Sequence, residues 1–245
     1  EPKNYFTMAR DLVDMGFSGV DINMGCPIKD MIKKGACSAM IQNPTLANEV
    51  IAATKEGSGG KIPVSVKTRI GFNKIDTQNW IGNLLEQKLD AIIVHGRTRK
   101  EMSKVPAHWD EVKKAVELRD KIAPNTVIIG NGDVMSREQG IELAKQTGVD
   151  GIMIGRGIFQ DLFVFEEIKK SHTPKEMLGI LMEHIKLYEK QWGSERSYEP
   201  LKKFYKVYIN GFGGASQIRA EIMNTKNTTE AKKYIEYLTK PFAIY

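Results

Sequence analysis

The sequence predicts an α/β fold of the (β/α)8, or TIM-barrel, class followed by a helical domain, and three observations support this. Five short β-branched runs alternate with longer amphipathic stretches, which is typical of parallel strands covered by helices. The last two runs end in glycine-rich turns, Gly130–Asp133 and Gly155–Gly157, and loops after barrel strands 7 and 8 often bind phosphate. From residue 172 onward, the helical pattern continues without any strand between.

The five predicted strands are nearly continuous in apolar residues, as strands buried on both faces must be. If the last two are the seventh and eighth strands of a barrel, the first is the fourth, and we expect the chain to lack roughly the first three βα units. A five-stranded open sheet is the alternative, and it needs no missing part. The predicted strands are Gly19–Met24, Pro63–Arg69, Ala91–His95, Thr126–Gly130 and Gly151–Ile154.

Helical patterns fill the intervals between these strands. Ser136 and Gln139 predict a capping box at the start of a helix that ends at Gly148. Further helices are predicted over residues 3–16, Trp109–Ile122 and Asp161–Lys170. The barrel domain is therefore expected to comprise residues 1–171.

The remaining residues, 172–245, are predicted to form a separate helical domain. Thr173 and Glu176 make a capping box around Pro174, which suits the first helical position. The helix that begins there is expected to run through Trp192, with one apolar stripe. Two or three more helices are predicted over approximately Glu199–Asn210, Ala215–Asn224 and Thr228–Lys240.

Composition narrows the class of protein. The 245 residues are 41% hydrophobic, and no apolar run reaches the roughly 20 residues needed to span a bilayer. The start of the chain does not resemble a signal peptide. The two cysteines cannot form a disulfide framework, and no Cys/His spacing indicates a zinc site. We expect a cytoplasmic protein with no membrane or metal partner.

The net charge of +6 is unevenly distributed. Residues 1–165 contain 22 basic and 20 acidic groups, whereas residues 166–245 contain 14 and 10. This excess permits binding of nucleic-acid phosphates. A solvated charged surface is the simpler explanation of the charge taken alone.

Polar residues at the carboxyl ends of the strands are the candidate site residues, because ligands of parallel α/β folds bind there. Cys26 lies just past the first strand, where a thiol can face a ligand, but its position alone slightly favours a small buried cysteine. Lys67 and Arg69 share one face of the second strand. Burying two cations is expensive unless they meet an anion, and a salt bridge to a neighbouring carboxylate is the alternative.

His95 ends the third strand, where a core histidine bonded to backbone explains it about equally well. Arg97 and Arg99 follow in what is expected to be a solvated loop. The candidate residues form a cationic rim that suits a phosphorylated planar cofactor. No GxGxxG motif follows a strand, so a Rossmann fold is not supported.

Five ordered segments resemble the bacterial type of the flavin-dependent tRNA-dihydrouridine synthases: Asp21–Pro27, Val64–Arg69, Val94–Arg99, Gly130–Asp133 and Gly151–Gly157. The resemblance covers essentially the whole chain. It implies a TIM barrel with a helical domain that cradles tRNA, tightly bound FMN, and NADPH as reductant. The implied reaction is reduction of the C5–C6 bond of specific uridines in tRNA, with hydride passing from FMN to C6.

The resemblance also implies roles for individual residues. Cys26 is the expected acid that protonates C5, and Cys37, where the family commonly has a small residue, is expected to be structural. Asn23 and Arg69 are expected beside substrate or flavin. The expected FMN-binding residues are Lys67 and His95 at the ring or ribityl chain, and Asn131, Gly132, Asp133, Gly155 and Arg156 at the phosphate.

Two other functions stay open from the sequence. One is an FMN barrel reductase of a free pyrimidine, similar to the dihydroorotate dehydrogenases, which would not need the basic helical extension. The other is a non-catalytic RNA-binding fragment on the same scaffold. We expect the chain to be a monomer whose partner is tRNA.

Overall fold

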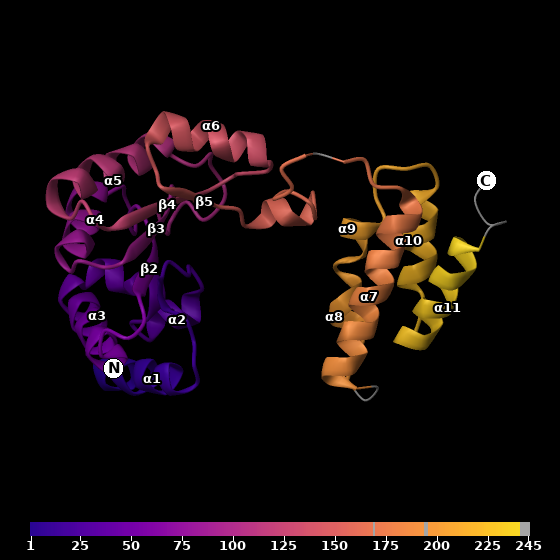
Figure 1. The fold of residues 1–245 in the computed structure, drawn as a ribbon, viewed down its shortest axis with the longest axis horizontal. Coiled ribbons are helices and arrows are strands. Elements are labelled where there is room, and N and C mark those ends of the chain that lie inside the picture. The colour runs from indigo at the N-terminus through magenta and orange to yellow at the C-terminus, as the bar shows by residue number, and fades with distance from the viewer. Residues whose placement is uncertain (169, 194–195, 241–245) are drawn as a thin grey trace. The chain divides into compact units, whose positions relative to one another are not determined.

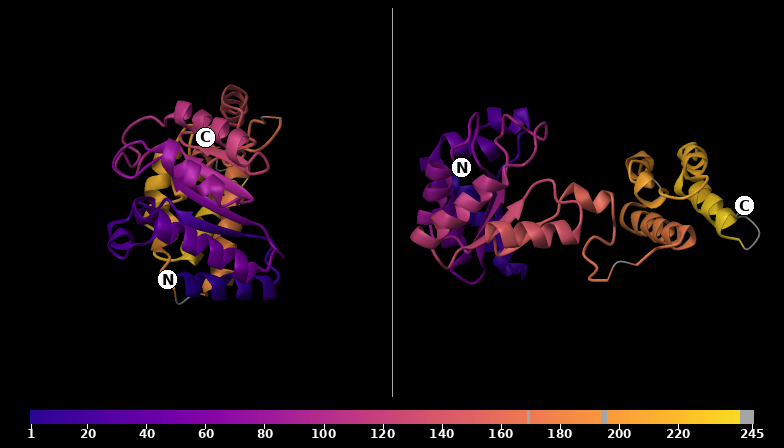
Figure 2. Two further views of the ribbon diagram at one scale, coloured as in Figure 1. Left: turned by 90° about the vertical axis from the view of Figure 1, so that its left-hand side faces the viewer. Right: turned by 90° about the horizontal axis from the view of Figure 1, so that it is seen from above.

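The structure, a computed structural model, describes residues 1–168, 170–193 and 196–240 (Figures 1 and 2). It divides into two compact units, Glu1–Gly157 and Ile158–Tyr245. The first unit contains a parallel sheet with helices, and the described part of the second is helical. None of the helices in the described ranges is both long and apolar enough to cross a membrane.

The first unit alternates strands and helices along the chain, and α3 to α6 follow one another along one face of the sheet (Figure 1). Its strands are β1 (Val20–Met24), β2 (Val64–Arg69), β3 (Ala91–His95), β4 (Val127–Asn131) and β5 (Gly151–Met153). Its helices are α1 (Pro2–Asp14), α2 (Lys29–Lys33), the 3-10 helix η1 (Cys37–Gln42), α3 (Pro44–Ser58), α4 (Thr77–Glu86), α5 (Trp109–Ile122) and α6 (Arg137–Thr147). A second 3-10 helix, η2 (Arg156–Phe159), follows β5.

All five strands are parallel and pair in sequence order, β1-β2-β3-β4-β5. The predicted α/β fold of the TIM-barrel class is confirmed. Asn23 is level with Lys67, Arg69 with His95, and His95 with Asn131. The carboxyl ends of neighbouring strands therefore bring the predicted site residues to one edge of the sheet.

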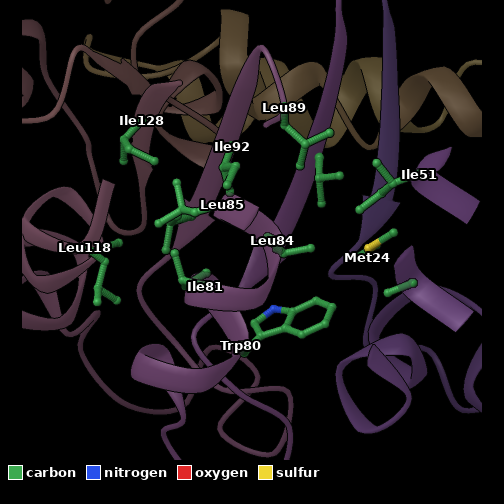
Figure 3. Close-up of a cluster of buried hydrophobic side chains, with 14 of the residues drawn as sticks. Met24, Ile51, Trp80, Ile81, Leu84, Leu85, Leu89, Ile92, Leu118 and Ile128 are labelled. Carbon is green, nitrogen blue, oxygen red and sulfur yellow. The ribbon is translucent and has the colours of Figure 1, made fainter. Parts of the chain in front are cut away.

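Alternation along β2 separates the core from the site. Val64, Val66 and Thr68 are buried, and the Trp80 indole donates to Thr68 Oγ1 at 2.9 Å. Lys67 lies on the opposite face, as the period of two requires. Figure 3 shows the core beneath the strands, where residues of α4 lie beside residues of β1, β3 and β4: Trp80, Ile81, Leu84, Leu85, Met24, Ile92 and Ile128.

Carboxylates fix the register at the opposite edge of the sheet. Asp90 Oδ2 accepts the Val64 N–H at 2.7 Å, and Asp150 Oδ2 accepts the Ile128 N–H at 2.7 Å. Asp150 also accepts from Arg119 Nη1 at 2.6 Å. A register slip of one residue would turn every strand side chain to the other face, so these bonds help keep the site residues on theirs.

Two predicted helix starts are confirmed. Ser136 Oγ accepts the Gln139 N–H at 3.1 Å, and the Gln139 side chain returns to the Met135 N–H at 2.8 Å, one residue earlier than in a standard capping box. Thr173 and Glu176 form the complete reciprocal box at the start of α7.

The second unit contains α7 (Pro174–Trp192), α8 (Glu199–Lys202), α9 (Tyr205–Tyr208), α10 (Ala215–Met223) and α11 (Thr228–Thr239). Its core is built from residues such as Leu181, Ile185, Tyr205, Ile222 and Ile235. The predicted continuous helix Glu199–Asn210 is wrong: it is divided into α8 and α9. The interruption lies at Lys203 and Phe204, and Leu201, Tyr205 and Tyr208 on either side of it are all buried in the core.

The predicted helix Asp161–Lys170 is also wrong. Residues 161–168 form turns, and Lys169 lies outside the described residues. Asp161 Oδ1 accepts the Phe163 N–H at 2.9 Å, a local bond that competes with helix formation. By its contacts this segment belongs to the helical unit, which begins at Ile158. The sequence pattern places the boundary later, at residue 172.

Candidate active site

A cavity of about 280 Å³ opens at the carboxyl ends of β2 to β5. Its lining contains all seven residues that the sequence analysis assigned to a cofactor: Lys67, His95, Asn131, Gly132, Asp133, Gly155 and Arg156. They come from four strand ends that are adjacent in the sheet. The structure therefore assembles the predicted rim into one concave surface.

Lys67 lies on β2 and donates from Nζ to Asn131 Oδ1 at 3.2 Å. The Asn131 amide nitrogen donates to the Met153 carbonyl at 2.8 Å, which fixes the orientation of the amide. Burial lowers the pKa of Lys67, and the positive charge of Arg69 lowers it further. The charge of Asp21 opposes this lowering, but none of the salt bridges among the described residues includes Lys67, so the salt-bridge alternative does not hold for this residue.

His95 is held as a neutral imidazole. Burial and the positive charges of Arg69, Lys67 and Arg97 together lower its pKa to about 3. Its Nε2 lies 3.3 Å from Arg97 Nη1. Because a guanidinium only donates, Nε2 is the acceptor and Nδ1 carries the proton. His95 therefore bonds to a side chain and presents a neutral ring to the cavity.

Asp133 organises two arginines at the cavity wall. Its Oδ2 accepts from Arg97 Nη2 and from the Ala107 N–H, and its Oδ1 lies 3.4 Å from Arg156 Nη2. Burial raises the pKa of this carboxyl, but the bonds from Arg97 and Ala107 outweigh burial and lower it overall. Asp133 is therefore an anion that orients arginines.

The two arginines differ in exposure. The Arg97 side chain is 3% exposed, whereas that of Arg156 is 63% exposed. Arg97 also donates from Nε to the Val105 carbonyl. The expectation that Arg97 belongs to a solvated loop is wrong, because Asp133, His95 and a carbonyl compensate its burial. Arg156 keeps its guanidinium open to the cavity.

Backbone groups complete the cavity wall. Gly132 has a φ of +135°, and a Cβ there would lie 2.6 Å from Ala107 Cβ and 3.3 Å from the His95 ring. A Cβ at Gly155 would meet nothing within 4 Å, so this backbone borders open space. No acceptor among the described residues takes the N–H groups of Gly132, Gly155 and Arg156. Such free, clustered N–H groups suit an anion.

Cys26 lies on the turn after β1, next to the strand that carries Lys67. Asn23 Oδ1 accepts the N–H groups of Gly25 and Cys26 at 3.0 and 3.1 Å. Arg69 Nε donates to the Gly25 carbonyl at 2.8 Å. Asn23 and Arg69, which were predicted beside substrate or flavin, thus hold the backbone of the cysteine turn, and their contact with a ligand stays a prediction.

Arg69 is buried through further bonds from Nη1 to the carbonyls of Thr98 and Met102, at 3.1 and 3.0 Å. Burial lowers its pKa, and Arg97 lowers it further. The carbonyls take the place of the carboxylate that a salt bridge would supply. The Cys26 thiol is half-buried and not oxidised to a disulfide.

Comparison with known proteins decides the family. The model of the dihydrouridine synthases matches residues 1–242. The chain belongs to the dihydrouridine synthase family. It is 45% identical to a probable tRNA-dihydrouridine synthase of Staphylococcus epidermidis over 238 residues, which covers 96% of this chain and 72% of the relative. A probable tRNA-dihydrouridine synthase 2 of Bacillus subtilis is 44% identical over the same shares.

Dihydrouridine synthases are flavin-dependent oxidoreductases, and the cavity suits a flavin. The fit rests on a half-buried lysine with no salt-bridge partner, an exposed arginine, and unpaired N–H groups beside an open glycine. The family is also a TIM-barrel family, in agreement with the parallel sheet. Among the described residues, no group of three or more His, Cys, Asp or Glu side chains is arranged to hold a metal ion.

Sequence reasoning missed part of this dihydrouridine synthase site. Arg97 was discounted, and Ser103, Met135 and Met153 were not considered, yet all four line the cavity. The position of Arg97 two residues after His95 was the available signal. The other histidines carry no comparable role: His184, for example, bonds through Nδ1 to the Tyr208 hydroxyl at 2.7 Å inside the helical unit.

Proposed function

We propose that this dihydrouridine synthase reduces the C5–C6 double bond of uridines in tRNA, using FMN that NADPH has reduced. One observation supports this most strongly: a single cavity in a chain of this family gathers all seven predicted cofactor residues. The named relatives are probable tRNA-dihydrouridine synthases, which favours tRNA as the substrate.

The cavity residues divide into two groups with respect to FMN. Arg156 and the free N–H groups of Gly132 and Gly155 would hold the phosphate, because an exposed guanidinium and backbone donors suit that dianion. Lys67 and the neutral His95 would face the ring system or ribityl chain. Bound FMN supplies the hydride for C6, and the protein supplies position and charge.

Cys26 would deliver the proton to C5. A thiol is a competent general acid when it is held at the reacting atom. Asn23 and Arg69 would contribute by fixing the turn, since they bond both sides of the Gly25–Cys26 peptide. The uracil must leave the base stack of a folded RNA to reach this thiol.

The helical unit would hold RNA through a broad groove of about 870 Å³. Exposed Lys203 and Lys206 line it together with Phe159 and Phe204, and Lys203 Nζ lies 4.8 Å from the centre of the Phe204 ring. Lysines beside aromatic rings suit phosphates and unstacked bases. This chemistry favours a nucleic-acid partner over a free pyrimidine.

We further propose that the enzyme acts as a monomer, because a single chain provides both the cavity and the basic groove. We also propose that it acts in the cytoplasm, which suits an enzyme that modifies tRNA. The experiment is a reduction assay with purified protein, FMN and NADPH. It compares an unmodified tRNA with free uridine and with orotate. We expect dihydrouridine in the tRNA alone. Reduction of a free pyrimidine, or tRNA binding without any reduction, would support one of the two alternative functions instead.

A further inference from the structure

The two cysteines of the chain lie side by side, although 10 residues separate them in sequence. Cys26 is on the turn after β1, and Cys37 begins η1. Ser38 connects the two segments, since its Oγ and its N–H both donate to the Cys26 carbonyl, at 2.7 and 3.4 Å. The backbone on each side is therefore held in place before any reaction between the sulfurs.

The two thiols are close enough for the charge of Cys26 to act on Cys37. Both residues are half-buried, so a small molecule has access to them. Burial raises the pKa of the Cys37 thiol, and the charge and hydrogen bond of Cys26 raise it further. Cys37 therefore reacts slowly with a small disulfide in solution. We expect it to act second, by attacking a mixed disulfide that has already formed on Cys26.

Cys37 also has an unusual backbone. Its φ of +55° lies in the left-handed region, which glycine occupies without steric cost. A residue with a Cβ is strained there, and a purely structural small residue at this position has no need of sulfur. What the cysteine adds is a second thiol in a segment that Ser38 bonds to the Cys26 carbonyl.

We propose that Cys26 and Cys37 form a reversible disulfide that occupies the Cys26 sulfur and stops catalysis when a low-molecular-weight disulfide oxidises the protein. This inference rests on the proposed acid role of Cys26. The Cys26 thiolate attacks the small disulfide, which leaves a mixed disulfide and releases one small thiol. Cys37 then gives up its proton and attacks the Cys26 sulfur, releasing the second small thiol. The protein loses two electrons and two protons, and the small disulfide gains them.

The test uses hydroxyethyl disulfide and mercaptoethanol in fixed ratios, with peptide mapping by mass spectrometry. The wild type is expected to lose two hydrogens and to yield a peptide linking Cys26 to Cys37. The Cys37→Ser variant is expected to keep its basal activity and to accumulate a mercaptoethanol adduct on Cys26. The second step is intramolecular. The wild type is therefore expected to oxidise at a ratio of hydroxyethyl disulfide to mercaptoethanol at least about tenfold lower than the variant requires.

Cys37→Gly provides a second variant that suits the left-handed φ and so guards against misfolding of the serine variant. A stable adduct on wild-type Cys26, or a disulfide between two chains, overturns the proposal. Activity is followed in parallel, and dithiothreitol is expected to restore it. An internally oxidised protein that still forms dihydrouridine overturns the switch and the acid role of Cys26, while the mapped bond itself remains established.

Discussion

Two pairs of basic residues, one in each compact unit, lie in opposite environments. In the first, Arg69 and Arg97 are buried and bond to carbonyls or a carboxylate. In the second, Lys203 and Lys206 are exposed at the edge of an open groove. A buried cation determines the geometry of a site, because each of its hydrogen bonds holds a neighbouring group in position. An exposed cation attracts a ligand through its charge, which salt screens. Substitutions in the first unit should therefore disturb geometry, and those in the second should change affinity alone.

The largest expected effect in the first unit comes from Cys26→Ala. Removing a general acid lowers a rate by about 10²- to 10⁴-fold. The turn keeps its backbone bonds to Asn23 and Arg69, so flavin binding is expected to persist. Single-turnover formation of dihydrouridine measures the rate, and Cys37→Ser is the matched control. A Cys26→Ala protein with full activity would refute the acid role.

Arg97→Met tests whether buried cations maintain the site geometry. The substitution leaves the Asp133 carboxylate and His95 without their shared partner, and breaking a buried pair costs about 3 kcal/mol. We expect urea denaturation to show a loss of that order together with weakened flavin binding. Exposed Arg10→Met, which removes a surface pair with Asp11, is the control and should cost little. Equal losses in the two variants would contradict the comparison.

His95 predicts a pH dependence of stability. Its pKa in the folded protein is about 3, below the ordinary value of 6.5. As pH falls from 6.5 towards 3, His95 therefore binds a proton in the unfolded state but not in the folded state. Stability is therefore lost on acidification through this window, by up to about 1.4 kcal/mol per pH unit from this group. His95→Gln should flatten the profile of unfolding free energy between pH 6 and about 4. An unchanged slope would mean that His95 is protonated in the folded protein.

The smallest expected effect belongs to the second unit. Lys203→Ala combined with Lys206→Ala should weaken tRNA binding and reduce the slope of log affinity against log salt by about 2. Flavin binding and the rate at saturating tRNA should stay unchanged. Lys186→Ala is the matched control, because Lys186 is exposed but already paired with Glu183 at 2.8 Å. If both variants change the salt slope equally, the groove is not the RNA contact.

The sequence predicted the strand ends well because their chemistry is local. Alternation placed Lys67 opposite Val64 and Val66, and the glycine turns marked the ends of the last two strands. Arg97 was misjudged because its partner Asp133 follows 36 residues later, and only the pairing of β3 with β4 brings them together. The periodicity of the sequence cannot predict a contact between residues so far apart.

The missed helix at Asp161–Lys170 has a different cause. Apolar and acidic residues there satisfy a helical pattern, but the Asp161 side chain bonds to the Phe163 N–H, and Phe163 stacks on His172 with ring centres 3.5 Å apart. A side-chain bond to the backbone and a ring contact within the same segment thus override a weak helical preference. The spacing of the cysteines does not predict that the segments of Cys26 and Cys37 lie together, because this depends on the bonds from Ser38 to the Cys26 carbonyl.

The central claim is that the cavity at the ends of β2 to β5 binds FMN with its phosphate at Arg156. The most direct test is titration of FMN and of riboflavin, which lacks the phosphate, into wild type and Arg156→Ala. We predict that the substitution weakens FMN binding about tenfold or more, the loss of one charge-assisted contact, and leaves riboflavin binding unchanged. Equal weakening of both ligands, or no weakening of FMN, would contradict this placement of the phosphate.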